Sequence, residues 1–228
     1  YELVENLTYE FGKEVIARKS HVLLAPGINI HRNPLCGRNF EYFSEDPYLT
    51  GKMAVAYIKG VQSAGASATP KHFACNNQES KRGINDSRVS QRALREIYLK
   101  GFEICIKEAN PDCLMTSYNK LNGVYNYFNY ELVTTILRDD WGYKGCVMTD
   151  WWMKNGKSKH FKTLKTQAYR VRAQVDVFMP GAPNYGIHKG KSDGTLLKSL
   201  NGDDGITLAE LQRSAKNVLK LCIKHSAK

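Results

Sequence analysis

The stretch GCVMTDWW, residues 145–152, places an apolar run directly before a carboxylate and two tryptophans. The run has the length and composition of a buried β-strand. Asp150 follows it in surroundings that are costly for an unpaired charge, so this residue needs either partners or a function.

Four other segments show the same pattern of an apolar run with a polar or glycine end: residues 21–29, 66–73, 112–119 and 174–181. Helical periodicity fills the intervals and both flanks: residues 1–19, 47–65, 89–108, 130–142 and 207–225. Strands that alternate with helices, each strand almost wholly apolar, predict a parallel α/β sheet covered by helices.

The first and last helices each carry an apolar stripe at helical spacing, which is why both segments are predicted to be helical. In the first helix the stripe consists of Leu3, Leu7, Phe11 and Val15. In the last helix a capping-box pattern, Thr207 with Glu210, precedes the stripe. That stripe consists of Leu208, Leu211, Ala215, Val218, Leu219 and Cys222.

Polar residues gather where the predicted strands end: Asn29, Lys71, His72, Tyr118, Asn119 and Asp150. In a (β/α) barrel these ends line a single mouth, which is where active sites lie. An open doubly wound sheet is the alternative, but neither G-x-G-x-x-G nor a Walker loop is present. A complete (β/α)8 TIM-type barrel has about 250 residues, and five units are visible. We therefore expect residues 1–228 to form a single, incomplete barrel domain.

The net charge of +11 comes from 33 basic and 22 acidic residues, and much of the excess is local. Seven cations and no acid lie between residues 154 and 172: Lys154, Lys157, Lys159, Lys162, Lys165, Arg170 and Arg172. A solvated loop and helix face explains this run, and a nucleic-acid site is the alternative. Because no zinc-finger spacing or aromatic RNA-binding signature accompanies it, we expect no nucleic-acid partner.

The other composition signals are mostly negative. No apolar run approaches the 18 or so residues that cross a bilayer, so no membrane association is expected. The six cysteines show no C-x-x-C spacing, which predicts buried free thiols and weakly favours the cytoplasm. The six histidines show no metal-ligand spacing, and no cofactor is expected.

Asp150 admits two interpretations at this point. It could cap a following helix, or it could act as a carboxylate at the barrel mouth, where Trp151 and Trp152 offer flat faces suited to a sugar ring. Lys71 and His72 end one strand, and Arg82 follows shortly after; such donors can grip hydroxyl groups. The loop of residues 34–47 adds charges interleaved with aromatics, which suits carbohydrate binding; its charged residues are Arg38, Glu41, Glu45 and Asp46. Surface ion pairing explains Glu45 and Asp46 equally well.

Several motifs resemble the barrel domain of glycoside hydrolase family three, the β-glucosidase and β-xylosidase family. They are APGINIHRNPLCGRNFEYFSEDPYLTGKMA (25–54), KHFACNNQE (71–79), MTSYNKLNG (115–123) and VMTDWW (147–152), followed by GITLAELQRSAKNVLK (205–220). The resemblance implies a retaining hydrolase acting on a β-glucoside or related oligosaccharide, with Asp150 as the nucleophile. It also implies the sugar-binding residues Arg38, Lys71, His72, Arg82, Met115, Tyr118 and Trp151.

Two departures qualify this expectation. The family's first strand bears a sugar-binding aspartate, and its β-glucosidase branch takes the acid/base glutamate from a C-terminal α/β sandwich domain; we expect both to lie outside this sequence. Glu41 and Glu79 are carboxylates in the right region, but nothing matches them to the acid role. A carbohydrate-binding remnant without turnover and a β-xylosidase are therefore the alternatives to a β-glucosidase.

Overall fold

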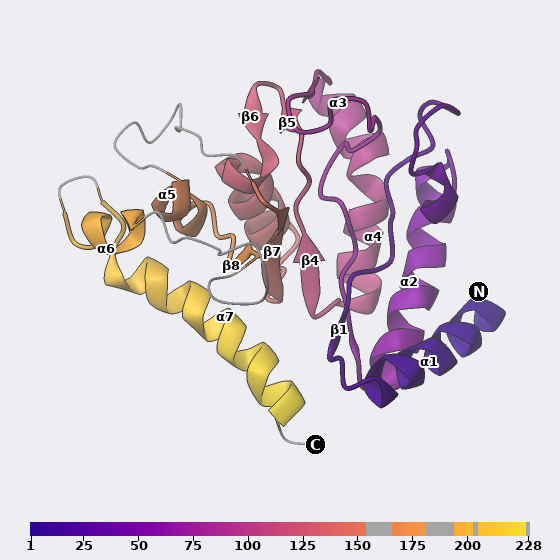
Figure 1. Cartoon of the computed structure of the whole chain (residues 1–228). Helices are drawn as coiled ribbons and strands as arrows, with labels where there is room; N and C mark the ends of the chain where they lie inside the picture. The colour runs from indigo at the N-terminus through magenta and orange to yellow at the C-terminus, as the bar shows by residue number, and fades with distance from the viewer. Residues whose placement is uncertain (154–165, 181–193, 203–204, 227–228) are drawn as a thin grey trace.

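The computed structural model describes residues 1–153, 166–180, 194–202 and 205–226 (Figure 1). Its elements are, in chain order, α1 (Glu2–Ala17), β1 (Val22–Leu23), η1 (Asn39–Glu41), α2 (Pro47–Ser63), β2 (Ser67–Ala68), β3 (Asp86–Ser87), α3 (Gln91–Ala93), η2 (Leu94–Tyr98), α4 (Lys100–Ala109), β4 (Cys113–Met115), β5 (Lys120–Leu121), β6 (Val124–Tyr125), η3 (Asn126–Phe128), η4 (Glu131–Asp140), β7 (Cys146–Trp151), α5 (Thr166–Arg172), β8 (Val177–Met179), α6 (Thr195–Ser199) and α7 (Leu208–Ser226).

Five strands run parallel and lie side by side in chain order. Val22 in β1 pairs with Ser67 in β2, and a bridge between Phe73 and Thr116 joins the extension of β2 to that of β4. β4 then pairs with β7, and β7 with β8. All five strands predicted from the sequence are confirmed, and so is their parallel arrangement.

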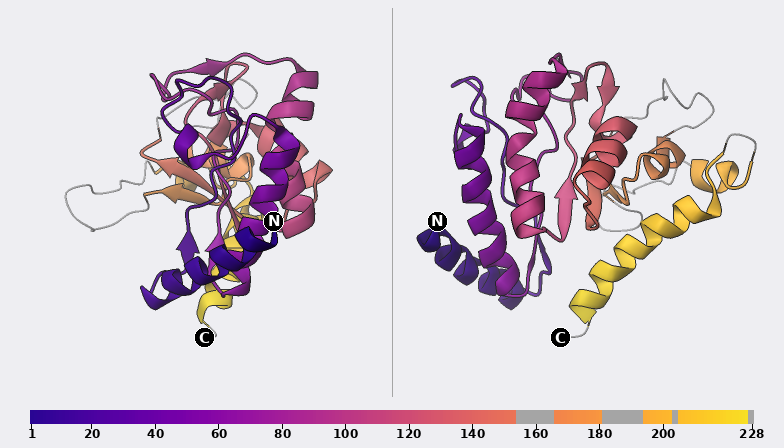
Figure 2. Two further views of the ribbon diagram at one scale, coloured as in Figure 1. Left: turned by 90° about the vertical axis from the view of Figure 1, so that its right-hand side faces the viewer. Right: turned by 180° about the vertical axis from the view of Figure 1, so that it is seen from behind.

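Alternate residues of the strands face two separate cores. Leu114 and Val147 pack with residues of α1, α2, α4 and η4. Of these helices, α2, α4 and η4 stand side by side on that face (Figure 2). Met115 points to the opposite face, where Val218 and Leu221 of α7 pack. The parallel strands are therefore covered on both faces, as their apolar sequences require.

Helix α1 is confirmed, but of the four residues in its apolar stripe only Val15 is buried. Gly12 and Val15 are buried, whereas Leu3 and Leu7 are 80% and 68% exposed. A Cβ added at Gly12 would lie 2.7 Å from the Cβ of Ala64, just beyond α2. The two helices thus cross at backbone distance, and this close approach sets which side of α1 turns inward.

Helix α7 is confirmed, and its apolar stripe is only partly covered. Val218 packs against the strands, but Leu219 is 59% exposed. An ion pair between Lys224, in the last turn of the helix, and Asp112 joins α7 to the start of β4.

Closure of the strands into a barrel is not seen within the described residues. There, β1 pairs only with β2, and β8 pairs only with β7. The described part of the chain is therefore an open parallel array with helices on both faces.

A small second sheet, which the sequence analysis did not predict, supports the loop after β2. β3 pairs with β5, and β5 forms a hairpin with β6. The turn of that hairpin is Asn122–Gly123, and both residues have positive φ. An Asn-Gly pair between two short strands is a strong hairpin signal, so this sheet could have been predicted.

The basic segment is only partly described. Arg170 is 5% exposed, and its guanidinium lies 5.0 Å from the ring centroid of Phe128. Arg172 forms an ion pair with Glu210. Both arginines therefore serve packing of the fold; the five lysines of the segment, at positions 154, 157, 159, 162 and 165, lie outside the described residues.

All six cysteines lie in the described residues and are unpaired; five are buried, and Cys222 is exposed. Across the described residues, no three metal-ligating side chains gather in one place. None of the described helices combines the length and hydropathy needed to cross a bilayer.

Arg138 ties the starts of β7 and β8 to η4. Its guanidinium donates to the carbonyl of Gly145 at 2.7 Å and to the carboxylate of Asp176 at 2.8 Å. The Asp176 side chain, with none of its surface exposed, also accepts from the backbone N–H of Val147 and from Asn217 of α7. This buried pair therefore fixes the strand that carries Asp150 at its other end.

Candidate active site

Asp150 lies near the C-terminal end of β7 and is 8% exposed. Its Oδ1 accepts a 2.8 Å hydrogen bond from the backbone N–H of Trp151. Its Oδ2 has no hydrogen-bond partner among the described residues, which is a costly state for a buried carboxylate oxygen. Residues 151–153 are not helical, so the capping interpretation is wrong, and Oδ2 is left available for chemistry or a ligand.

The charge of Asp150 is balanced between burial and its neighbours. Burial raises the pKa of the carboxyl above its ordinary value, because an interior charge loses hydration. The N–H of Trp151, the Tyr118 hydroxyl and the guanidinium groups of Arg82 and Arg38 lower this pKa. These groups favour the ionised form that a nucleophile requires.

The ring of His72 lies beside Asp150, with Nε2 3.8 Å from Oδ2. That distance is longer than a hydrogen bond. Desolvation, together with the cations Arg38, Lys71 and Arg82, lowers the pKa of His72 well below its ordinary value. The imidazole is therefore neutral at neutral pH, and it can offer either a donor or an acceptor to a hydroxyl group.

Asn29 fixes the backbone of His72. Its amide nitrogen donates to the carbonyl of His72 at 3.0 Å, and its amide oxygen accepts from the N–H of His72 at 2.9 Å. The Lys71–His72 peptide bond is cis. The polar residues predicted at the ends of two neighbouring strands are thus in direct contact.

Arg82 and Tyr118 form the side of the site that follows β2 and β4. The Arg82 guanidinium lies 4.4 Å from the ring centroid of Tyr118, which is a cation–π contact. The same guanidinium donates to Oε2 of Glu79 at 2.8 Å. Two contacts therefore hold Arg82 in one orientation.

Arg38 and Lys71 are joined by one carboxylate. Arg38 donates to Oε1 of Glu41, and Nζ of Lys71 lies 3.3 Å from Oε2 of the same residue. Burial acts to raise the pKa of Glu41, but the hydrogen bond from Arg38 and the charge of Lys71 outweigh it, so this pKa lies below its ordinary value. Glu41 is therefore held in its ionised form.

A cavity of about 220 Å³ opens beside these residues. Its walls combine the Arg82 guanidinium with aromatic rings, which suits a ligand with both hydroxyl groups and an apolar face. The lining residues are Arg82, Gly83, Tyr118, Tyr127, Trp151 and Trp152.

Met115 is placed differently from the other predicted site residues. Its side chain is 2% exposed and belongs to the core on the face of the strands that α7 covers. Trp151 packs against the same core. Met115 therefore lies beneath an aromatic wall of the cavity and does not itself line it.

The sequence analysis did not single out Tyr42 or Asn76. The Tyr42 hydroxyl lies 3.3 Å from Nδ1 of His72, and Asn76 donates to that hydroxyl at 3.3 Å. In the sequence, Tyr42 is one of several aromatic residues in the charged loop. Two charged loop residues are explained by the fold instead: Asp46 caps α2, and Glu41 bridges two cations.

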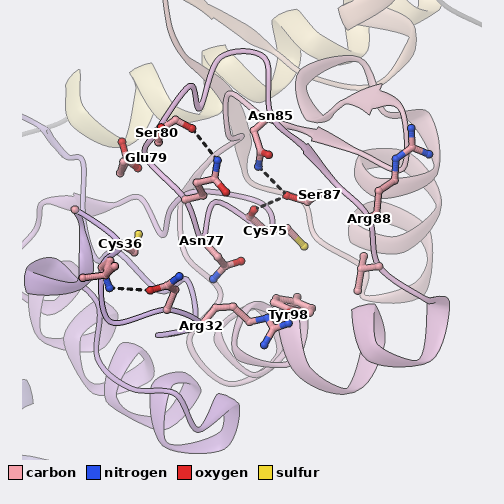
Figure 3. A pocket seen from close by; sticks show the side chains of 15 residues that line it. Arg32, Cys36, Cys75, Asn77, Glu79, Ser80, Asn85, Ser87, Arg88 and Tyr98 are labelled. Carbon is pink, nitrogen blue, oxygen red and sulfur yellow. Dashed lines mark hydrogen bonds between the residues drawn. The ribbon is translucent and has the colours of Figure 1, made fainter.

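A second cavity, of about 930 Å³, is lined in part by the loop that bears Glu79 (Figure 3). Its wall includes Arg32 and Cys36 from one loop, and Asn85, Ser87 and Arg88 from another segment. Several of its polar side chains are engaged within the protein; for example, Asn77 donates to the carbonyl of Ile30 at 2.6 Å. This cavity is separate from the groups around Asp150.

Comparison with known proteins points in one direction. The family model described as "Glycosyl hydrolase family 3 N terminal domain" matches residues 1–221. A β-glucosidase of Ruminococcus albus is 46% identical over 225 residues, which is 99% of this chain and 23% of that protein. An exo-α-(1→6)-L-arabinopyranosidase of Bifidobacterium breve is 42% identical over 99% of this chain and 27% of its own length.

Solved structures agree with these relatives. The β-glucosidase 3B of Thermotoga neapolitana in complex with glucose matches with a TM-score of 0.85 and 43% identity, over 98% of this chain and 30% of that chain. The chain thus spans 23% to 30% of the length of these three relatives.

Proposed function

Because this chain belongs to glycosyl hydrolase family 3, we propose that it carries the nucleophile half of a β-glucosidase active site. Asp150 attacks the anomeric carbon and forms a bond to it while the bond to the leaving oxygen breaks. Water then hydrolyses the covalent glycosyl–enzyme, so the configuration at the anomeric carbon is retained.

The observation that carries this proposal is the state of Asp150. One carboxylate oxygen is held by the N–H of Trp151, and the other is buried without a hydrogen-bond partner among the described residues. The carboxylate is therefore held in one orientation, and its second oxygen makes no structural hydrogen bond that would prevent it from attacking a ligand. The neighbouring cavity supports the proposal, since Tyr118 and Trp151 belong to its wall.

We propose that the groups around Asp150 hold the first sugar ring. The donors of Arg38, Lys71, His72 and Arg82 would bind hydroxyl groups, and Trp151 would pack against the ring. Hydrogen bonds that strengthen as the ring distorts toward an oxocarbenium-like transition state would contribute to the rate. Met115 supports Trp151 from the core beneath it.

The general acid/base is proposed to come from a part of the protein outside these 228 residues. A general acid needs a raised pKa, whereas the pKa of Glu41 is lowered by Arg38 and Lys71. Glu79 is occupied by Arg82 and Asn76. Neither carboxylate noted in the sequence is therefore suited to protonate a leaving group.

We further propose that additional β/α units complete the five-stranded array as a barrel. Within the described residues the outer edge of β1 is unpaired. Next to it, α1 exposes Leu3 and Leu7, a pair of side chains that another helix could cover.

Glucose is the proposed sugar because the β-glucosidases are among the relatives that cover almost the whole chain. An L-arabinopyranoside is the second candidate, since the Bifidobacterium relatives cover 99% of the chain at similar identity. β-Xylosidase specificity and a binding remnant without turnover are further outcomes of the test.

The test uses activated 2-deoxy-2-fluoroglycosides, because their leaving groups depart without protonation and the step needs only the nucleophile. The purified chain is incubated with the glucoside, the xyloside or the arabinopyranoside, and its intact mass is followed with time. The proposal predicts a gain of one fluoroglycosyl group, fastest from the glucoside. A folded chain that binds glucose and gains no mass would instead be a binding remnant.

The rate of this labelling is expected to fall as the pH is lowered through the pKa of Asp150. Burial raises that pKa, so the midpoint should lie above the ordinary range of an aspartate, and only the ionised form attacks. The measurement is the labelling rate from about pH 4, in the ordinary aspartate range, to about pH 8. A rate that stays constant down to the ordinary aspartate range would contradict the role assigned to burial.

Arg82→Met is expected to slow labelling by about 10- to 100-fold, the size of one lost hydrogen bond to a charged group. It should also move the midpoint of the pH profile upward, because Arg82 lowers the pKa of Asp150. Arg88→Met is the matched control, since Arg88 is an exposed arginine paired with Asp86. Equal rates for both variants would remove Arg82 from the site.

A further inference from the structure

A chain of hydrogen bonds leads from the ion pair of Arg82 to the ring of His72. Arg82 donates to Oε2 of Glu79, and Asn76 donates to Oε1 of the same carboxylate at 2.9 Å. Asn76 also donates to the Tyr42 hydroxyl, which lies 3.3 Å from Nδ1 of His72. The direction of each bond in this chain can be assigned from the groups at its ends.

The orientation of the Asn76 amide is fixed by Glu79. A carboxylate paired with a guanidinium is ionised and can only accept hydrogen bonds, so the amide nitrogen must face it. Turning the amide over would bring its oxygen against the carboxylate, which places two acceptors together. In this orientation, Oδ1 of Asn76 is buried and has no hydrogen-bond partner among the described residues.

The direction continues through Tyr42. One hydrogen of the Asn76 amide goes to Glu79 and the other to the Tyr42 oxygen, which therefore acts as an acceptor. Desolvation raises the pKa of Tyr42, so the phenol keeps its own hydrogen, and Nδ1 of His72 lies 3.3 Å away as an acceptor for it. When Nδ1 accepts this hydrogen, the single proton of the neutral imidazole is on Nε2.

We propose that Tyr42 and Asn76 are positioning residues that hold His72 as the neutral Nε2–H tautomer and so direct a hydrogen-bond donor toward Asp150. Nε2 lies 3.8 Å from Oδ2 of Asp150, and Asn29 prevents the backbone of His72 from shifting. The other charged groups that act on His72 are cations, Arg38, Lys71 and Arg82, and they oppose a second proton on the ring.

The consequence for catalysis rests on the function proposed above. A neutral donor can bind a sugar hydroxyl beside the nucleophile, whereas an imidazolium would pair with Asp150 and reduce its reactivity. The other tautomer would present a lone pair to the carboxylate, and two acceptors would then face each other. The tautomer itself can be tested without any activity.

The test is nitrogen NMR of the chain with ¹⁵N-labelled histidine at neutral pH. Two-bond and three-bond couplings from the ring hydrogens distinguish a protonated from an unprotonated ring nitrogen. The signals of His72 are those lost in His72→Gln. The wild-type chain should show the Nε2–H form, and Tyr42→Phe should convert His72 to a mixture or to the Nδ1–H form.

Tyr57→Phe is the matched control, because Tyr57 is another shielded tyrosine, on α2, that contacts Phe43 and does not take part in this hydrogen-bond chain. It should leave the His72 signals unchanged. An Nδ1–H tautomer in the wild-type chain would overturn the proposal, and this result needs no variant to fold. An unchanged tautomer in folded Tyr42→Phe would also overturn it.

Labelling by the fluoroglucoside gives the second readout. Tyr42→Phe should slow it by about three- to tenfold, as expected for loss of one hydrogen bond, and Tyr57→Phe should not. If the wild-type chain is not labelled but the tautomer shifts as predicted, the proposed function fails and the positioning role stands. If labelling occurs and the tautomer does not shift, the positioning role fails alone.

Discussion

Asp150→Asn is expected to lower the rate of labelling by the activated fluoroglucoside by at least about 10³-fold, because the amide cannot form the covalent bond. Asparagine keeps an oxygen that can accept from the N–H of Trp151, so the local geometry should survive. Asp140→Asn is the control, since Asp140 pairs with Arg95 at the surface. Labelling that persists in folded Asp150→Asn would exclude Asp150 as the nucleophile.

The stability of the same variant shows whether it is folded and tests the effect of burial. The folded chain raises the pKa of Asp150, so it binds this proton more tightly than the unfolded chain does. The contribution of Asp150 to stability therefore falls as the pH rises through that pKa. At about pH 7, Asp150→Asn should have a higher melting temperature than the wild type. The difference between the two melting temperatures should become smaller as the pH is lowered. A lower melting temperature at neutral pH would contradict this account.

Arg138→Met is expected to destabilise the chain by about 3–5 kcal/mol, the cost of leaving one member of a buried ion pair alone. Without Arg138, Asp176 would have either to hold an unpaired charge or to take up a proton, in a site with none of its side-chain surface exposed. The carbonyl of Gly145 would also lose its guanidinium donor. The measurement is the free energy of unfolding from urea titration.

Arg95→Met serves as the control for the buried pair. Arg95 and Asp140 form an ion pair of similar length, but both side chains are more than two-fifths exposed. Such surface pairs contribute about 0–1 kcal/mol, so the loss should be small. If the two arginine variants lose the same stability, the buried pair does not organise the starts of β7 and β8 as the structure indicates.

The strands could be predicted from the sequence because each is a short apolar run with a distinct polar end. Asp150 was found for the same reason, since a charge directly after such a run is unusual. The Asn-Gly turn at positions 122 and 123 is equally visible in the sequence and predicts a hairpin. It explains the small sheet beneath the loop that carries Arg82.

Helix faces and polar networks were harder to predict. In α1 the apolar residues Leu3 and Leu7 are exposed, because the close approach of Gly12 to Ala64 sets the rotation of the helix. A glycine carries no hydropathy signal, so the apolar residues of this helix do not by themselves indicate its buried side. The contact of Tyr42 with His72 joins residues 30 positions apart, and no local pattern in the sequence indicates it.

The central claim is that Asp150 forms the covalent bond to the sugar. The direct measurement is proteolysis of the chain after reaction with an activated 2-deoxy-2-fluoro-β-glucoside, followed by mass mapping of the labelled peptide. The account predicts one fluoroglucosyl group, attached at Asp150 within the peptide that contains VMTDWW. A label on any other residue, or a folded chain that binds glucose and remains unlabelled, would contradict it.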